Sequence, residues 1–168
     1  MRKFEKISFN QYAADRLKQE QVDDDMLRAE WENIKLPTAA TSGSAGYDFY
    51  LPVGMSFGAT PSIIQTGIRF VTDEPVFLLL APRSGLGFKY GMRLSNTIGI
   101  VDSDYWKALN EGHIAAKVVS DISFSLGRGD RFIQGIIVPY MLADNGNSED
   151  ARIGGFGSTG TTTERYNI

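Results

Sequence analysis

The glycines of this 168-residue chain are unevenly distributed, and this distribution limits the folds that the chain can adopt. None of the 18 glycines precedes Gly43. From Ser44 onward, short apolar runs alternate with Gly and Pro, a pattern typical of strands separated by turns. The predicted strands are Ala45–Tyr50, Ser62–Thr66, Ile68–Thr72, Val76–Ala81, Ile98–Val101, Ile114–Val119 and Ile133–Tyr140. Because no helix of about 10–15 residues separates consecutive strands, the pattern favours an antiparallel sandwich or barrel over a parallel sheet.

The segment before the glycines carries helical signals instead. Ser8 and Gln11 have the spacing of a capping box, and apolar residues follow them at helical intervals. Asp23–Asp25 suit the first turn of a second helix, which Pro37 would close. We predict a helical extension packed on the main body rather than a separate functional module. The predicted parts are an N-terminal extension over 1–36, a β domain over 37–142 and a polar, Gly-rich tail over 143–168.

The composition excludes several classes of protein. With 42% hydrophobic residues the chain has a globular rather than a disordered composition, and no apolar run reaches the roughly 18 residues that span a bilayer. The 17 basic and 20 acidic residues create no broad positive field for nucleic acid, so an anionic ligand must be held by local groups. Cysteine is absent and no apolar segment follows the basic start, which together predict a cytoplasmic protein.

Four polar stretches could carry chemistry, although each alone could also be an ordinary turn or tail. They are Pro82–Gly87, Asn96–Tyr105, Arg128–Gln134 and Gly155–Gly160. The last has the spacing of a dinucleotide fingerprint, but only eight residues follow it and no helix can form there. Asp102 directly follows an apolar strand, where it could accept a proton from water or, together with Asp104, ligate a metal.

Because His113 is the only histidine in the sequence, a His-rich metal site is excluded. Nothing in its sequence context marks it as a catalytic base. We therefore expect a structural or solvated role for His113.

Five motifs follow one another along the chain: Ala45–Asp48, Pro82–Gly85, Gly99–Tyr105, Gly129–Gln134 and Gly155–Gly160. Taken in order, they closely resemble those of the trimeric deoxyuridine triphosphatases, the dUTPases. The resemblance runs from about Leu36 to Gly160. It implies an all-β fold, a distorted jelly roll or β-sandwich of the β-clip type, with the N-terminal helical segment as an addition. It also implies a homotrimer with shared active sites that hydrolyses dUTP to dUMP and pyrophosphate with Mg²⁺.

The resemblance further implies a role for individual residues. Asp102 would be the general base, Tyr105 would pack under the deoxyribose, and Asn96 with the backbone around Gly99 would read the uracil. The residues implied to contact the phosphates are Arg83, Ser84, Gly85 and Gln134. The tail residues implied to close over the nucleotide are Arg152, Phe156, Gly157, Ser158 and Thr159. No side chain would ligate Mg²⁺ directly, and Asp48 would lie near its water shell.

The sequence departs from the family pattern in three places. Trp106–Asn110 lengthens the loop after Tyr105, one residue is missing between Arg152 and Gly154, and the spacer between Gln134 and Arg152 is short. Two alternatives stay open. One is an enzyme similar to dCTP deaminase, which needs a glutamate in the pocket at the nucleobase. The other is a catalytically silent, nucleotide-sensing trimer with an unidentified regulatory partner.

Overall fold

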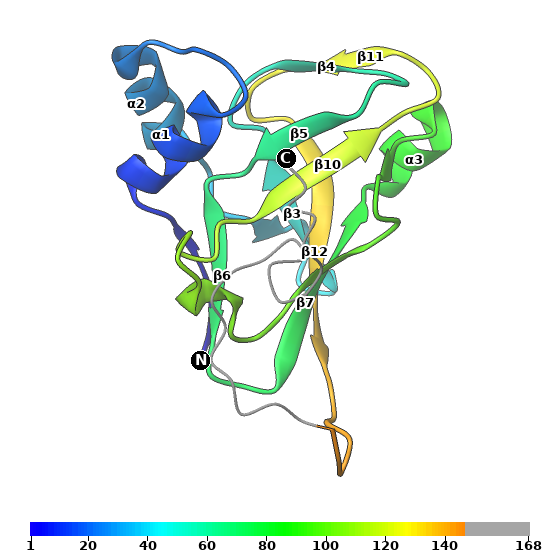
Figure 1. Cartoon of the computed structure of the whole chain (residues 1–168). Helices are drawn as coiled ribbons and strands as arrows, with labels where there is room; N and C mark the ends of the chain where they lie inside the picture. Colours follow the sequence, from blue (N-terminus) through cyan, green and yellow to red (C-terminus); the bar gives the residue numbers. More distant parts are fainter. Residues whose placement is uncertain (147–168) are drawn as a thin grey trace.

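The computed structural model describes residues 1–146, which form an antiparallel β structure with three helices and a short 3₁₀ turn. Figure 1 shows the chain with most of these elements labelled. The strands are β1 (Arg2–Lys6), β2 (Thr38–Ala39), β3 (Gly46–Tyr50), β4 (Met55–Phe57), β5 (Ser62–Gln65), β6 (Ile68–Thr72), β7 (Val76–Pro82), β8 (Arg93–Leu94), β9 (Gly99–Val101), β10 (Ala115–Val119), β11 (Phe124–Leu126) and β12 (Arg131–Pro139). The helices are α1 (Phe9–Leu17), α2 (Asp24–Glu32) and α3 (Ser84–Tyr90), and the 3₁₀ turn η1 is Tyr105–Lys107.

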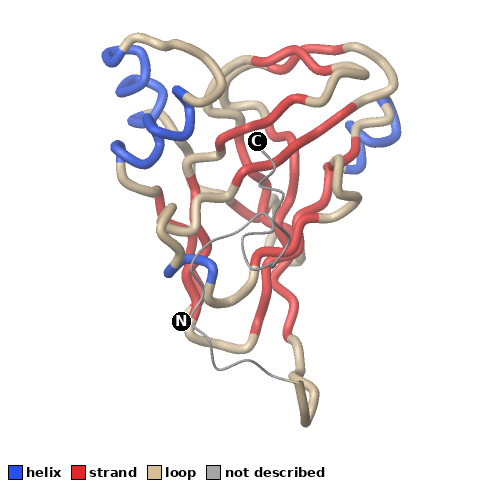
Figure 2. Tube along the Cα trace, in the orientation of Figure 1, coloured by secondary structure: helices blue, strands red, loops and turns tan. Residues whose placement is uncertain are grey.

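Four sheets are formed by these strands, and the paired strands are antiparallel. The largest sheet has the order β2-β3-β12-β7-β9, and its long strands β7 and β12 run through the middle of the molecule (Figure 2). Along β7, buried Val76, Leu78 and Leu80 alternate with less buried neighbours, as expected for a strand with one face on the core. All seven strands predicted from the sequence are present, with ends that differ by one or two residues.

The core lies between the sheets and is filled by aromatic and branched aliphatic side chains. Its largest fully buried members are Tyr12, Phe49, Phe70, Phe132, Ile7, Leu27, Leu51, Ile64, Ile68, Leu78, Met92 and Ile114. Tyr12, Ile7 and Leu27 come from the N-terminal extension. The extension is therefore packed on the β body, as the sequence predicts.

The N-terminal extension begins with a strand that the sequence analysis did not predict. Strand β1 pairs with β6 from Arg2 opposite Thr72 to Lys6 opposite Ile68. The two predicted helices follow, and they lie side by side on one flank of the β body, away from α3 (Figure 1). The Ser8 hydroxyl accepts a hydrogen bond from the Gln11 backbone N–H, as the capping spacing predicts.

Helix α3 is the main element that the sequence did not indicate. We expected a turn at Pro82–Gly87, whereas the chain continues from β7 into a helix that begins at Ser84 and ends at Tyr90, capped by Gly91 with φ +64°. Two glycines within its seven residues weaken the helical signal of this segment. Among residues 1–146, no helix is long and apolar enough to cross a membrane.

Candidate functional site

Three charged side chains meet where β3, β7 and β12 lie next to one another. Asp48 on β3 accepts a hydrogen bond from Arg83 Nε at Oδ1 and another from Arg131 Nη1 at Oδ2, each at 3.0 Å. Asp48 is buried, while both arginines stay partly exposed. One carboxylate between two guanidinium groups leaves a formal charge of +1. Such a cluster suits the recognition of phosphate oxygens, for which arginine is well adapted.

Arg131 belongs to the fourth motif, but the sequence analysis gave it no role. The one available signal was its place in the charged turn Arg128–Arg131 that enters β12. Its contact with Asp48 depends on the pairing of β12 with β3, which distant residues determine. Sequence spacing alone could not supply that partner.

Gln134 lies beside this cluster on β12. It is opposite Asp48 on β3 and opposite Ala81 on β7, and its Nε2 donates to the Pro82 carbonyl at 3.3 Å. A Cβ atom on Gly46 would come within 2.5 Å of the Gln134 Oε1, so glycine at this position gives the amide its room. The structure therefore brings Asp48, Arg83 and Gln134 together.

Ser84 and Gly85 form the first turn of α3, directly after Arg83. Both residues are exposed, and the backbone N–H groups of a first helical turn have no acceptor within the helix. The predicted turn is thus corrected to a helix start. The Ser84 hydroxyl and the backbone N–H groups of this turn still lie next to Arg83 in the chain.

The residues of the third motif lie along β9 and the loops at its two ends. Asn96 is exposed in the turn before β9, and Gly99 pairs with Leu80 of β7. Asp102 is half-buried directly after β9, and its carbonyl accepts from the Tyr105 N–H at 3.2 Å to begin η1. Tyr105 is only 6% exposed, and its hydroxyl donates to the His113 carbonyl at 3.1 Å and accepts from Asn110 Nδ2 at 2.8 Å.

Within one chain, Asp102 and the charged cluster lie at opposite ends of β7, although Gly99 of the same motif pairs with Leu80 nearer the cluster. Val101 pairs with Leu78, so Asp102 falls level with Phe77 near the start of β7, whereas Arg83 follows its end. Six residues of extended strand correspond to about 20 Å. A single chain therefore does not bring Asp102 to the side chains that could bind phosphate.

Two hollows on the described surface lie elsewhere. One is lined by residues of α1, β4 and β5, including Tyr12 and Ile64, and the other by residues around β4 and β11, including Phe57 and Phe124. Neither contains a candidate site residue.

His113 has the structural role that its context predicts. It is 1% exposed, its Nε2 accepts from the Gly67 N–H at 2.9 Å, and its Nδ1 lies 2.8 Å from Asp15 Oδ2. Because Nε2 accepts, the proton of the neutral ring sits on Nδ1 and is donated to Asp15. The proposed tail residues Arg152, Phe156, Gly157, Ser158 and Thr159 lie outside the described residues.

Comparisons with known proteins show the family to which the chain belongs. The sequence model of the dUTPase family matches residues 32–160. A deoxyuridine 5'-triphosphate nucleotidohydrolase of Shewanella sp. (strain MR-7) is 40% identical over 135 residues, which cover 75% of this chain and 87% of that protein.

Among solved structures, the dUTPase of Streptococcus mutans superposes with a TM-score of 0.62 at 29% identity and covers 84% of this chain and 98% of its own. A mutant dUTPase from phage phi11 of Staphylococcus aureus, described with a coordinated structural Mg(II) ion, has a TM-score of 0.58 at 19% identity and shares the fold over 71% of this chain and 92% of its own. With its antiparallel β-clip fold, its ordered motifs and a family match over most of its length, the chain belongs to the dUTPase family, the enzymes that hydrolyse dUTP.

Proposed function

We propose that this dUTPase releases dUMP and pyrophosphate at sites shared between the subunits of a homotrimer. The observation that carries the proposal is the separation of about 20 Å, along β7, between Asp102 and Arg83. A base that activates water for attack on the α-phosphorus must lie within a few ångströms of the groups that bind the phosphates. Asp102 of one subunit would therefore serve the phosphates held by Arg83 of another.

Strand β9 offers a surface for such an assembly. It is the last strand of the five-stranded sheet, and Ile98 and Ile100 next to its buried Gly99 are 44% and 50% exposed. An open sheet edge with exposed isoleucines is favourable for contact with a second copy of the chain. The third motif occupies this same edge, which fits a site completed across the interface.

The described side chains suit distinct roles in the reaction. Asp102 would accept the proton of the attacking water. Arg83, Gln134 and the first-turn N–H groups of α3 at Ser84 and Gly85 would bind the phosphate oxygens. Phosphoryl transfer depends mainly on positioning and on stabilising negative charge, which these groups supply.

The residues present fit a Mg²⁺ ion that is held mainly by the nucleotide. Among residues 1–146 no three acidic or histidine side chains are grouped as a metal site, and Mg²⁺ commonly binds through substrate phosphates and water. When bound, the ion would neutralise phosphate charge and polarise the phosphorus. Asp48, whose two oxygens each accept from an arginine, would orient those arginines beside the ion's water shell.

Nucleotide selection would use the other motif residues. Asn96 and the backbone around Gly99 would read the uracil, and Tyr105 would lie against the deoxyribose where a 2′-hydroxyl would clash. The tail would close over the nucleotide, with Phe156 on the base and Arg152, Gly157, Ser158 and Thr159 at the phosphates. The enzyme would limit uracil incorporation into DNA and supply dUMP for dTMP synthesis. The absence of cysteine supports a cytoplasmic location.

The reaction is tested by incubating the protein with dUTP, dCTP or UTP and Mg²⁺ while pyrophosphate and ammonia are measured. Pyrophosphate from dUTP alone supports the proposal. Ammonia from dCTP would indicate the deaminase, and binding without turnover would indicate the nucleotide sensor.

The sharing of sites is tested by mixing two inactive variants, one lacking Arg152–Ile168 and one carrying Asp102→Asn. Co-refolded hetero-trimers should regain activity, because some sites then combine an intact Asp102 with an intact tail from a neighbour. Hetero-trimers as inactive as the two parents would contradict shared sites.

A further inference from the structure

The loop that follows Tyr105 folds back around this residue. Tyr105 is buried, its hydroxyl bonds to Asn110 and to the His113 carbonyl, and the Gly112 N–H donates to Asn110 Oδ1 at 3.2 Å. A Cβ atom on Gly112, which adopts φ +72°, would overlap the Trp106 backbone. We call residues 106–113 the Tyr105 loop. Its shape fixes the environment of the tyrosine hydroxyl.

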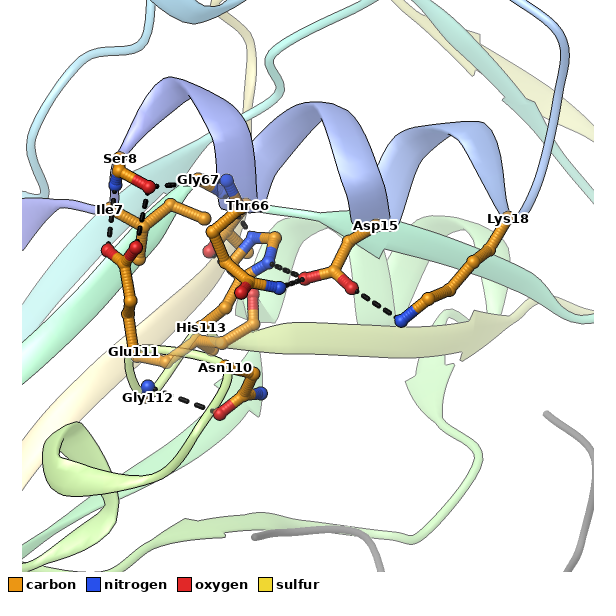
Figure 3. A network of polar contacts seen from close by, with 12 residues as sticks. Ile7, Ser8, Asp15, Lys18, Thr66, Gly67, Asn110, Glu111, Gly112 and His113 are labelled. Atoms are coloured by element: carbon orange, nitrogen blue, oxygen red, sulfur yellow. Dashed lines mark hydrogen bonds and ion pairs between the residues drawn. The ribbon is translucent and has the colours of Figure 1, made fainter.

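The N-terminal extension also contacts the Tyr105 loop, as Figure 3 shows. Glu111 Oε2 accepts from the Ser8 backbone N–H at 2.8 Å, and Glu111 Oε1 accepts from the Ser8 hydroxyl at 2.5 Å. Two residues farther along, His113 Nδ1 donates to Asp15 of α1. The side chains of Glu111 and His113 thus bond to the extension, while the backbone of His113 bonds to Tyr105.

The contact at Glu111 supports a conformation that the loop does not adopt easily by itself. Glu111 has φ +59°, in the left-handed region that is unfavourable for a residue with a side chain. Two hydrogen bonds to its carboxylate from the start of α1 offset this cost. Without them, Glu111 can relax and the turn through Gly112 to His113 can shift.

The contact at His113 is buried and fully bonded. Both ring nitrogens have a partner, and the Asp15 carboxylate also accepts from Gln11 Nε2 and Lys18 Nζ, each at 2.8 Å. A buried polar network in which every member is bonded is rigid. It therefore fixes the position of the carbonyl that accepts the Tyr105 hydroxyl.

From these contacts we infer that Glu111 and His113 are positioning residues through which the N-terminal extension sets the discrimination between deoxyribose and ribose. This inference rests on the proposed function, in which Tyr105 lies against the sugar. Residues 1–31 precede the segment that matches the dUTPase family model, so Ser8 and Asp15 act on the Tyr105 loop from outside that segment. The extension contacts Glu111 and His113, and only His113 bonds to Tyr105 itself.

The test compares two variants that weaken the contact between the extension and the Tyr105 loop with one variant that weakens bonds inside the extension. Glu111→Gln removes the charge that binds Ser8, and Asp15→Asn weakens the bond to His113. Glu30→Gln is the matched control, because Glu30 bonds to Tyr12 and Arg16 inside the extension and not to the Tyr105 loop. The quantity measured is the ratio of kcat/KM for dUTP to that for UTP in the full-length protein.

We expect Glu111→Gln and Asp15→Asn to lower this ratio by about 5–10-fold while kcat for dUTP changes by less than about threefold, since positioning of the sugar is affected more than the chemistry. Glu30→Gln should leave the ratio within about twofold even if it lowers the melting temperature. An unchanged ratio in folded Glu111→Gln, or an equal loss in Glu30→Gln, would overturn the inference.

Hydrogen–deuterium exchange of the nucleotide-free protein separates this inference from the proposed function. Glu111→Gln should speed exchange in residues 105–114 by about tenfold, and Glu30→Gln should speed it only within the extension. If the wild type fails to hydrolyse dUTP, the proposed function fails while exchange still reports on the positioning. Unchanged exchange over 105–114 in Glu111→Gln would refute the positioning itself.

Discussion

The two ends of strand β7 are organised by different forces. At the end that leads into α3, charged side chains hold one another, with Asp48 between Arg83 and Arg131. At the other end, a backbone turn joins Asp102 to Tyr105, and the Tyr105 hydroxyl makes two neutral hydrogen bonds. The first end is suited to binding negative charge and the second to placing a base and a sugar.

This difference teaches that substitutions at the two ends should change different kinetic constants. Loss of a group that acts only on the reacting water lowers kcat, whereas loss of a charge that binds phosphate weakens binding of the nucleotide. The following predictions test that division, beginning with the largest effect.

Asp102→Asn should lower kcat for dUTP by at least about a hundredfold, the usual scale for a lost general base, with nearly unchanged binding of a non-hydrolysable α,β-imido analogue. Steady-state kinetics and calorimetric titration provide the two measurements. Asp104→Asn, two residues along the same turn, should cost less than about threefold. If Asp104→Asn has the larger effect, the base is wrongly assigned.

Asp48→Asn should weaken binding of the same analogue by about tenfold with a smaller change in kcat, since a hydrogen bond between charged groups contributes roughly 1.5 kcal/mol or more. Both arginines lose their common anchor in this variant. Glu5→Gln, which breaks a carboxylate–arginine pair with Arg69 on the extension side, is the control and should leave binding unchanged. A kcat loss as large as that of Asp102→Asn would break the division between the two ends.

Tyr105→Phe should lower the dUTP to UTP ratio of kcat/KM by about threefold, because the ring stays as a wall while the His113 carbonyl and the Asn110 amide lose their hydrogen bonds to the hydroxyl. Tyr140→Phe removes a hydroxyl that lies 2.9 Å from Ser103 Oγ and serves as the control, with no expected change in the ratio. An equal effect of the two substitutions would show that the Tyr105 hydroxyl has no special place in specificity.

Low pH should destabilise the Tyr105 loop, because it weakens the contacts of this loop with the N-terminal extension. Burial alone would raise the pKa of Asp15, but hydrogen bonds from His113, Lys18 and Gln11 hold this pKa below its ordinary value. Burial would also raise the pKa of Glu111, but the hydrogen bonds from Ser8 outweigh burial and lower this pKa on balance.

A carboxyl with a lowered pKa stabilises the fold at pH above its unfolded value of about 4, and this contribution is lost as the pH falls toward the folded value. The melting temperature should therefore fall by a few degrees below about pH 4. Glu111→Gln should show a shallower fall in a thermal melt from pH 7 to pH 3. A wild-type melting temperature that stays constant over this range would contradict the prediction.

Much of the fold could be predicted because its signals are local. Gly and Pro between apolar runs predict where strands end, and the structure contains all seven of the predicted strands. Strands β2, β4, β8 and β11 were missed because two or three residues give too little alternation to be recognised. Strand β1 was missed because its sequence, RKFEK, is mostly charged and gains its place only by pairing with β6.

The candidate site divides in the same way. The sequence by itself determined which chemical groups are present, since the ordered motifs name Arg83, Asp102, Tyr105 and Gln134 directly. Only the tertiary structure decided which of them meet. The register of β9 on β7 separates Asp102 from Arg83, and the pairing of β12 with β3 joins Arg131 to Asp48. Strand pairing is a contact between residues far apart in the chain, so no local spacing carries it, and the same holds for the bond from Ser8 to Glu111 that ties the N-terminal extension to the Tyr105 loop.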